Sequence, residues 1–205
     1  MEVKPLKYSK LDGLSEKQLK EHHDVLYAGY VKKYNEINEK LTGVDLTTAN
    51  ATYSDLRELT IEKGFALNGV VLHEYYFEGM GGQGGVPTES IAELINKNFG
   101  SFDAWSEQFK ALGMTARGWV VLAYNFDTKK LENYICDVHN QGGVWNTTTL
   151  VVMDVYEHAY FIDYATKRAD YIEKYMANID WEEVNKRVSS NIPGYQTENN
   201  NNEGE

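Results

Sequence analysis

The sequence contains one cysteine, three prolines and no long run of apolar residues. Because Cys136 is alone, an intrachain disulfide is impossible, and the fold must be stabilised by its core. No window has the length and apolarity of a transmembrane helix. Residues 1–20 alternate between charged and polar side chains, whereas a secretory signal requires an apolar stretch. We therefore expect a cytoplasmic protein that does not contact membranes.

Basic residues are also scarce, since 20 Lys and Arg stand against 31 Asp and Glu, a net charge of −11. A surface of this sign repels phosphate groups, which excludes nucleic acid and anionic membranes as partners. Apolar residues make up 42% of the 205 positions and aromatic residues 13%, as in a folded globular protein. Residues 197–205 are too polar to pack, and we expect a disordered tail there.

The first part of the chain has apolar residues at helical spacing. A capping-box pattern at Ser15–Gln18 begins a predicted helix that continues to Leu41. Its apolar stripe consists of Leu19, His23, Leu26, Tyr30, Tyr34 and Ile37. A second predicted helix covers 56–77 and ends before a glycine-rich run and Pro87. Two successive helices joined by a polar segment predict an antiparallel hairpin, and we place the N-terminal domain at 1–87.

After Pro87 the pattern changes from helices to strands and back. Short helices are predicted at 88–98 and 101–116, strands at 119–125, 131–140 and 148–153, and further helices at 157–176 and 181–188. A short polar turn separates the first two strands, which indicates an antiparallel pair. The predicted fold class is α+β: an N-terminal antiparallel helical hairpin followed by a mixed domain, 88–196, with a three-stranded antiparallel sheet flanked by helices.

The histidines are the residues best suited to chemistry, and five are present: His22, His23, His73, His139 and His158. His22 and Tyr30 lie eight apart, which places an imidazole and a phenol on one helical face. Asp154 and His158 are four apart, just after the third strand. Three imidazoles and one carboxylate suit iron, manganese or zinc, whereas calcium prefers oxygen ligands. Spacing alone leaves open whether His22 or His23 takes part, and whether these side chains are instead hydrogen-bonded core residues.

Other catalytic motifs are absent from the sequence. His73-Glu74 lacks the second histidine, at position 77, that a zinc-protease helix requires. The glycine-rich run at 82–87 follows a helix instead of a strand and lacks the last glycine of a dinucleotide-binding loop. No serine stands in a Gly-x-Ser-x-Gly pattern, so we assign no nucleophile. The metal-ligand pattern remains the main candidate.

The segment 154–160 carries the most specific motif of the chain. Its sequence, Asp-Val-Tyr-Glu-His-Ala-Tyr, closely resembles the signature Asp-x-Trp-Glu-His-Ala-Tyr of the iron/manganese superoxide dismutases. The likeness extends over nearly the whole chain, through His22-His23, Tyr30-Val31, Asn68-Gly69 before His73, Phe99-Gly100-Ser101-Phe102, Gly118-Trp119 and Asn178-Ile179-Asp180-Trp181.

This resemblance implies one iron or manganese ion per subunit, held by the four metal ligands His22, His73, Asp154 and His158. The family places the first ligand eight residues before the helix tyrosine, which selects His22 and leaves a structural role for His23. The resemblance also places Tyr30 at the mouth of the active site and Trp119 in its wall.

Family members form dimers in which the glutamate of the motif reaches the ligand histidine of the other subunit, so the resemblance implies a homodimer, or a tetramer, with Glu157 in this role. The usual tryptophan of the motif is Tyr156 here. Many relatives pair a histidine with a tyrosine across the dimer, and those positions are Leu26 and Phe161. Both partners have changed, as avoidance of an unpaired buried polar group requires.

Most relatives bind the solvent on the metal through a glutamine. His139 matches a position where some relatives carry histidine, and Gln141 is the alternative. The implied activity is conversion of superoxide to dioxygen and hydrogen peroxide. One alternative is a metal-binding dimeric homologue without redox turnover. Another is a zinc hydrolase, although catalytic zinc normally has three protein ligands and an open position.

Overall fold

A computed structural model describes residues 1–195, so the predicted tail at 197–205 lies outside the described residues. The helices and strands, in chain order, are α1 (Glu16–Lys20), a π-helix (Glu21–Tyr27), α2 (Ala28–Thr42), a 3₁₀ turn (Leu46–Thr48), α3 (Asp55–Glu78), α4 (Glu89–Phe99), α5 (Phe102–Thr115), β1 (Trp119–Asn125), β2 (Lys130–Cys136), β3 (Thr147–Asp154), a 3₁₀ turn (Glu157–Ala159), α6 (Phe161–Tyr164), α7 (Arg168–Ala177) and α8 (Trp181–Asn191). No helix among the described residues is both long and apolar enough to cross a membrane.

The first long helix contains a π-helical segment, where the sequence predicts an uninterrupted α-helix. It begins as predicted at Ser15, whose side chain accepts a hydrogen bond from the Gln18 amide. The π-helical turns of Glu21–Tyr27 add a residue per turn and shift the helix face. As a result, Tyr27 and Val31 are buried in place of the predicted Leu26 and Tyr30, which are only partly buried. Tyr30 is thereby left at the edge of the interior.

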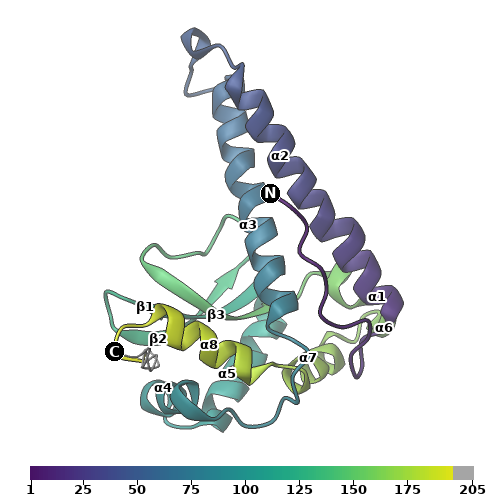
Figure 1. Ribbon diagram of the computed structural model, residues 1–205, viewed down its shortest axis with the longest axis vertical. Coiled ribbons are helices and arrows are strands. Elements are labelled where there is room, and N and C mark those ends of the chain that lie inside the picture. Colours follow the sequence, from purple (N-terminus) through teal and green to yellow (C-terminus); the bar gives the residue numbers. More distant parts are fainter. Residues whose placement is uncertain (196–205) are drawn as a thin grey trace, which may run out of the picture.

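Helices α2 and α3 form the predicted antiparallel hairpin, which projects from the rest of the molecule (Figure 1). The glycine-rich run after α3 joins this hairpin to the turn between α7 and α8. Gly81 donates to the carbonyl of Asn178 at 3.0 Å, and Gly84 donates to that of Ile179 at 3.2 Å. Gly84 has φ +57°, and a Cβ there would lie 2.2 Å from the Ala177 carbonyl oxygen, so this close approach requires glycine.

The sheet has the order β2-β1-β3, and both pairs are antiparallel, as predicted. Trp119, the first residue of the central strand, lies opposite Cys136 on one side and Asp154 on the other. The second strand ends at Cys136 and not at Asn140 as predicted. The chain turns away there because Asp137 accepts a hydrogen bond from the Arg117 amide and Gln141 donates to the Val138 carbonyl. His139 therefore lies in a loop.

The helix predicted at 157–176 is wrong in its extent, because the structure divides it into a 3₁₀ turn, α6 and α7. The chain reverses at Ala165, which has φ 48°. The hydroxyl of Tyr164 donates to the carbonyl of Gly13 at the reversal. The segment contains neither glycine nor proline, so its sequence gives no signal for the break.

The two faces of the sheet are covered by different helices. On one face, the Trp105 indole of α5 donates to Asn133 of β2, and Trp105 and Phe109 are fully buried. On the other face, α3 lies along β3. The architecture is thus α+β, with an N-terminal helical region followed by a three-stranded antiparallel sheet and helices, and the predicted fold class is confirmed.

A buried arginine connects the helical hairpin, the sheet and α8. Arg187 is 5% exposed, and its guanidinium donates to the carbonyls of Leu150 at 2.8 Å and Tyr75 at 3.3 Å. It also lies 4.5 Å from the centre of the Tyr75 ring and donates to Glu183 at 3.3 Å. These contacts neutralise and solvate a charge that burial would otherwise penalise.

We expect Arg187→Met to lower the free energy of unfolding by about 2–4 kcal/mol, because it leaves two carbonyls and a carboxylate without their donor. Denaturant unfolding would measure this change, with Lys186→Met as the matched control at an exposed position on the same helix. A loss for Arg187→Met no larger than that of the control would contradict this role.

Candidate metal centre

Four side chains from four different segments converge at the junction of the hairpin and the sheet. His22 comes from the π-helix, His73 from α3, Asp154 from the end of β3 and His158 from the 3₁₀ turn that follows. One donor atom of each lies within 4.8 Å of all the others. The Nε2 atoms of His22, His158 and His73 are 3.1, 3.2 and 3.7 Å from Asp154 Oδ2.

The cluster lies in the interior except for one edge. The side chains of His22, His73 and Asp154 are at most 1% exposed, whereas that of His158 is 25% exposed. Burial lowers the pKa of His73 to about 3 and also lowers the pKa of His22, so both imidazoles are neutral near pH 7.

The carboxylate at the centre of the cluster remains ionised. Burial by itself would raise the pKa of Asp154, but the neighbouring imidazoles, His158 above all, hold it well below its ordinary value. Burial likewise opposes protonation of His158, yet Asp154 raises the pKa of this imidazole. The interior therefore contains a negative charge that attracts a cation.

The donor set fits a transition-metal ion. Within the described chain, His73 Nε2 is buried without a hydrogen-bond partner, which is rare for a polar atom in a protein interior. Its Nδ1 donates to the Gly69 carbonyl at 2.6 Å, so the Nε2 lone pair faces the cluster. The Tyr156 amide donates to Asp154 Oδ1 at 2.9 Å, which leaves Oδ2 facing the three rings. Three imidazole nitrogens and one carboxylate oxygen suit iron or manganese.

A chain of hydrogen bonds runs beside this cluster, from Trp119 through His139 to Tyr30. The Trp119 indole donates to His139 Nδ1 at 3.0 Å, and His139 Nε2 lies 2.7 Å from Tyr30 Oη. An indole can only donate, so the proton of the neutral His139 ring is on Nε2 and is donated to Tyr30. Burial lowers the pKa of His139 to about 4, which keeps the ring neutral. The rings of Trp119 and Tyr30 lie 4.9 and 5.3 Å from that of His73.

Tyr30 can approach α3 closely because position 69 is glycine. A Cβ on Gly69 would lie 2.8 Å from Tyr30 Cδ1. Phe65, one turn earlier on α3, places its ring 4.6 Å from that of His139. The sequence reasoning did not select Phe65, because an apolar residue in a helix carries no chemical signal of its own.

Two further residues that the sequence reasoning missed fix the segments of the cluster. The Tyr171 hydroxyl donates to the Asp154 carbonyl at 2.6 Å. The buried amide of Gln18 donates to the His158 carbonyl at 2.6 Å and accepts from the Ile162 amide at 3.1 Å. In the sequence, Gln18 is indistinguishable from an ordinary residue of a helix cap.

Tyr156, which stands where the family motif has tryptophan, packs against the cluster. Its ring stacks on that of His158 at 5.0 Å, and its hydroxyl donates to the Asp137 carbonyl at 3.3 Å. The residue after it, Glu157, is exposed. Tyr156 therefore connects the segment of His158 with the loop that carries His139.

Two sequence candidates lie outside the cluster. His23 faces away from it, and its ring nitrogens lie 2.8 Å from the Lys4 carbonyl oxygen and 2.7 Å from Asp24 Oδ1. Of the two neighbouring histidines, the structure thus places His22 in the cluster. The side chain of Gln141 is exposed and takes no part in the hydrogen-bond chain through His139.

Comparison with known proteins identifies the family. The family profile described as iron/manganese superoxide dismutases, C-terminal domain, matches residues 87–187. An iron superoxide dismutase of Aquifex pyrophilus is 41% identical over 197 residues, which cover 93% of this chain and 92% of the relative. The iron enzyme of Aquifex aeolicus is 40% identical with the same coverage. A manganese superoxide dismutase of Haloferax volcanii is 33% identical over 92% of this chain and 94% of its own. The chain belongs to the iron/manganese superoxide dismutase family.

Proposed function

We propose that the protein is a superoxide dismutase, an oxidoreductase that converts superoxide to dioxygen and hydrogen peroxide at one iron or manganese ion per subunit. The observation that carries this proposal is the convergence of four donor atoms within 4.8 Å, with the buried His73 Nε2 otherwise unpartnered. A bound ion would supply one-electron redox chemistry, by which one superoxide is oxidised to dioxygen and a second, together with two protons, is reduced to hydrogen peroxide.

His22, His73 and His158 would hold the ion through Nε2, and Asp154 through Oδ2. Three contacts support this assignment by fixing the ligands before the ion binds. The Gly69 carbonyl sets the tautomer of His73, the Tyr156 amide orients the carboxylate, and the Tyr171 hydroxyl anchors the main chain of Asp154. Such contacts orient metal ligands and raise their basicity.

Tyr30 would supply a proton at the mouth of the site. Because His139 donates to its Oη, the hydroxyl hydrogen of Tyr30 is free to point towards a bound anion. Trp119 holds His139 in the required tautomer and forms a wall beside His73. We place His139, and not the exposed Gln141, at the position of the family glutamine, with the single N–H of His139 donated to Tyr30.

The protein would act as a homodimer that closes the exposed edge of the site. His158 is the most exposed of the four ligands, and the next residues along the chain include the apolar side chains of Phe161 and Ile162, which are 46% and 45% exposed. Burial of these side chains favours association. In this dimer Glu157 would bind the ligand histidine of the other subunit, and Leu26 with Phe161 would provide an apolar contact.

The two halves of the chain, 1–87 and 88–196, would act as two domains that enclose the ion, since each contributes two of the four donors. We further propose that the protein removes superoxide in the cytoplasm as part of antioxidant defence. A single buried cysteine, Cys136, needs no oxidising compartment for the fold.

We expect His22→Ala or Asp154→Ala to abolish metal binding and superoxide removal, because either change breaks the donor set. His23→Ala is the matched control, and it should keep the metal because the His23 ring faces Lys4 and Asp24. Metal analysis per subunit, together with an assay of superoxide removal, measures both effects. Equal metal loss at His22 and His23 would overturn the ligand assignment. Full iron or manganese occupancy without activity in the unaltered protein would instead support a metal-binding homologue without redox turnover.

Tyr30→Phe should leave the metal content unchanged and lower the rate of superoxide removal about 10- to 100-fold, because it removes the acceptor for His139 and the proton at Oη. Tyr34→Phe, four residues later on the same helix, is the control and should retain the full rate. If the two variants have equal activity, Tyr30 has no role in proton supply.

A further inference from the structure

The segment 1–10 contains no helix or strand, and most of its side chains are exposed. It nevertheless runs beside α2 and α3 as an extended trace (Figure 1). Lys4 connects this segment to both the first long helix and α3. Its amide, its carbonyl and its ammonium group all take part in these contacts. No regular structure holds the segment here, so its course depends on such individual bonds.

Two of the contacts of Lys4 reach the π-helical part of the first helix. The Lys4 amide donates to Tyr27 Oη at 3.0 Å, and the Lys4 carbonyl oxygen lies 2.8 Å from His23 Nε2. A carbonyl can only accept, so His23 Nε2 carries a proton and donates it. Both side chains are buried, since His23 is 5% exposed and Tyr27 is 1% exposed. His23 directly follows the proposed ligand His22.

The ammonium group of Lys4 reaches α3. Its Nζ lies 2.8 Å from Glu74 Oε2 and 2.8 Å from Glu78 Oε1. Burial by itself would lower the pKa of Lys4, but the hydrogen bonds to Glu74 and Glu78 raise it above its ordinary value, so the group stays charged. Glu74 directly follows the proposed ligand His73. Lys4 therefore connects the sequence neighbours of two ligands that lie on two different helices.

A direct bond between the two helices completes this network. Burial raises the pKa of Tyr27 to about 12, so the phenol keeps its proton and donates it to Glu74 Oε1 at 2.9 Å. Among the described residues, this is the one hydrogen bond that directly joins the first long helix to α3. The neighbouring contacts are between rings, and that of Phe77 lies 4.9 Å from His22 and 5.1 Å from His23. Ring packing is not directional, whereas hydrogen bonds are, so the network limits sliding of one helix along the other.

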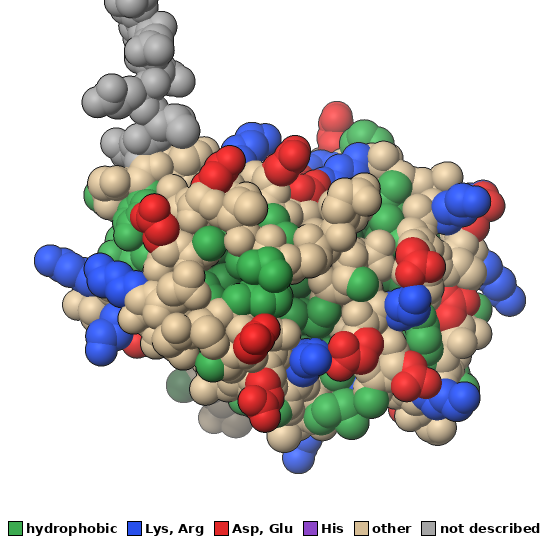
Figure 2. All heavy atoms as spheres, turned by 90° about the horizontal axis from the view of Figure 1, so that it is seen from below, with side chains coloured by type: hydrophobic (Ala, Val, Ile, Leu, Met, Phe, Trp, Pro, Cys, Tyr) green, Lys and Arg blue, Asp and Glu red, His purple; other side chains and the backbone are tan. Residues whose placement is uncertain are grey.

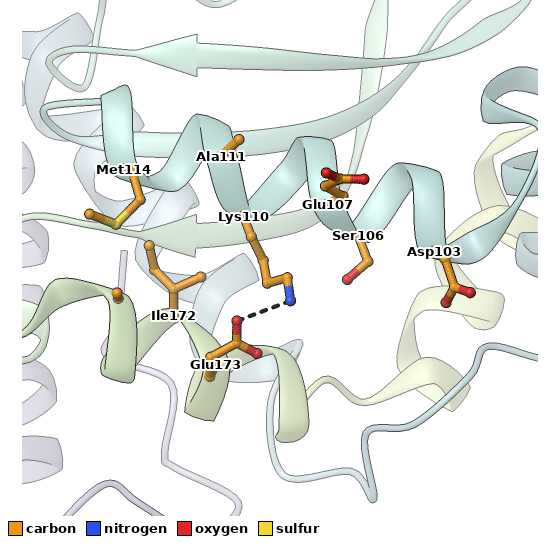
Figure 3. A pocket seen from close by; sticks show the side chains of 9 residues that line it. Asp103, Ser106, Glu107, Lys110, Ala111, Met114, Ile172 and Glu173 are labelled. Atoms are coloured by element: carbon orange, nitrogen blue, oxygen red, sulfur yellow. Dashed lines mark hydrogen bonds and ion pairs between the residues drawn. The ribbon is translucent and has the colours of Figure 1, made fainter.

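Ordinary ion pairs of this protein differ from the Lys4 network. On the face seen in Figure 2, basic and acidic side chains are interspersed. Between α5 and α7, Lys110 forms an ion pair with Glu173 at 3.0 Å, and their side chains are 34% and 64% exposed (Figure 3). Exposed pairs of this kind contribute little to stability. Lys4 instead bonds at four points, and its partner Glu74 is only 12% exposed.

We propose that Lys4 is a positioning residue of the metal centre. Together with Tyr27 and Glu74, it fixes the π-helix against α3 at the level of the ligands. This contact holds the rings of His22 and His73 at their separation of 5.0 Å before the ion binds. The inference rests on the proposed function, because it requires that these two rings bind an ion. Loss of the network would leave all four donors in place, so it would weaken metal binding without abolishing it.

Release of manganese(II) from the loaded protein into excess EDTA tests this role. We expect Lys4→Met and Tyr27→Phe to bind one ion per subunit at saturation and to release it about 10-fold faster or more. Lys4→Arg should restore slow release, because a guanidinium can also bond two carboxylates. Lys7→Met is the matched control, since Lys7 belongs to the same segment but pairs with Asp180, the N-cap of α8, at 2.5 Å. Its release rate should equal that of the unaltered protein.

The electron paramagnetic resonance spectrum of the bound manganese(II) gives a second readout, because it depends on the arrangement of the ligands. The spectrum should change in Lys4→Met and stay unchanged in Lys7→Met, although both variants lose one ion-paired lysine. Equal release rates for these two variants would overturn the proposal, as would identical spectra.

The outcome is separable from that of the proposed activity. Tight manganese binding without superoxide removal, with fast release from Lys4→Met alone, would contradict the activity and support the positioning role. Full superoxide removal with equal release rates for Lys4→Met and Lys7→Met would support the activity and overturn the positioning role.

Discussion

The carboxylate of Asp154, fully buried and surrounded by three imidazoles, is the interaction on which the rest of the structure depends. A carboxylate in the interior is costly unless opposite charge and hydrogen bonds compensate it. The Tyr156 amide supplies one such bond, and the rings of His22 and His73 come from the helical hairpin. The negative charge of Asp154 is therefore fully compensated only when the hairpin packs against the sheet. Formation of the metal site thus depends on formation of the fold.

The same constraint explains the hydrogen bonds around the cluster. The rings must present Nε2 to the centre, and neighbours fix two of them. The Gly69 carbonyl accepts from the other nitrogen of His73, and the side-chain amide of Gln18 donates to the main-chain carbonyl of His158. The hydrogen bonds that connect Trp119, His139 and Tyr30 follow the same principle outside the ligand cluster. Because an indole can only donate, Trp119 determines which nitrogen of His139 carries the proton.

The sequence predicted the fold class and most of the helices and strands, because apolar periodicity is a local signal. Spacing left His22 and His23 as alternatives, and the set of His22, His73, Asp154 and His158 followed from the resemblance to the family. The sequence could not predict the π-helical segment, in which His22 and Tyr27 are buried, because no local sequence signal marks it. The break at Ala165 was also missed, since a tertiary bond from Tyr164 to Gly13, and no local breaker, reverses the chain. Phe65 and Gln18 acquire their roles only from contacts between distant segments.

X-ray absorption spectroscopy at the metal edge tests the central claim most directly, because it reports the ligands of the ion in the loaded protein. The account predicts three imidazole nitrogens and one carboxylate oxygen around a single iron or manganese ion. A spectrum with fewer than three imidazoles, or with sulfur in the coordination shell, would contradict it.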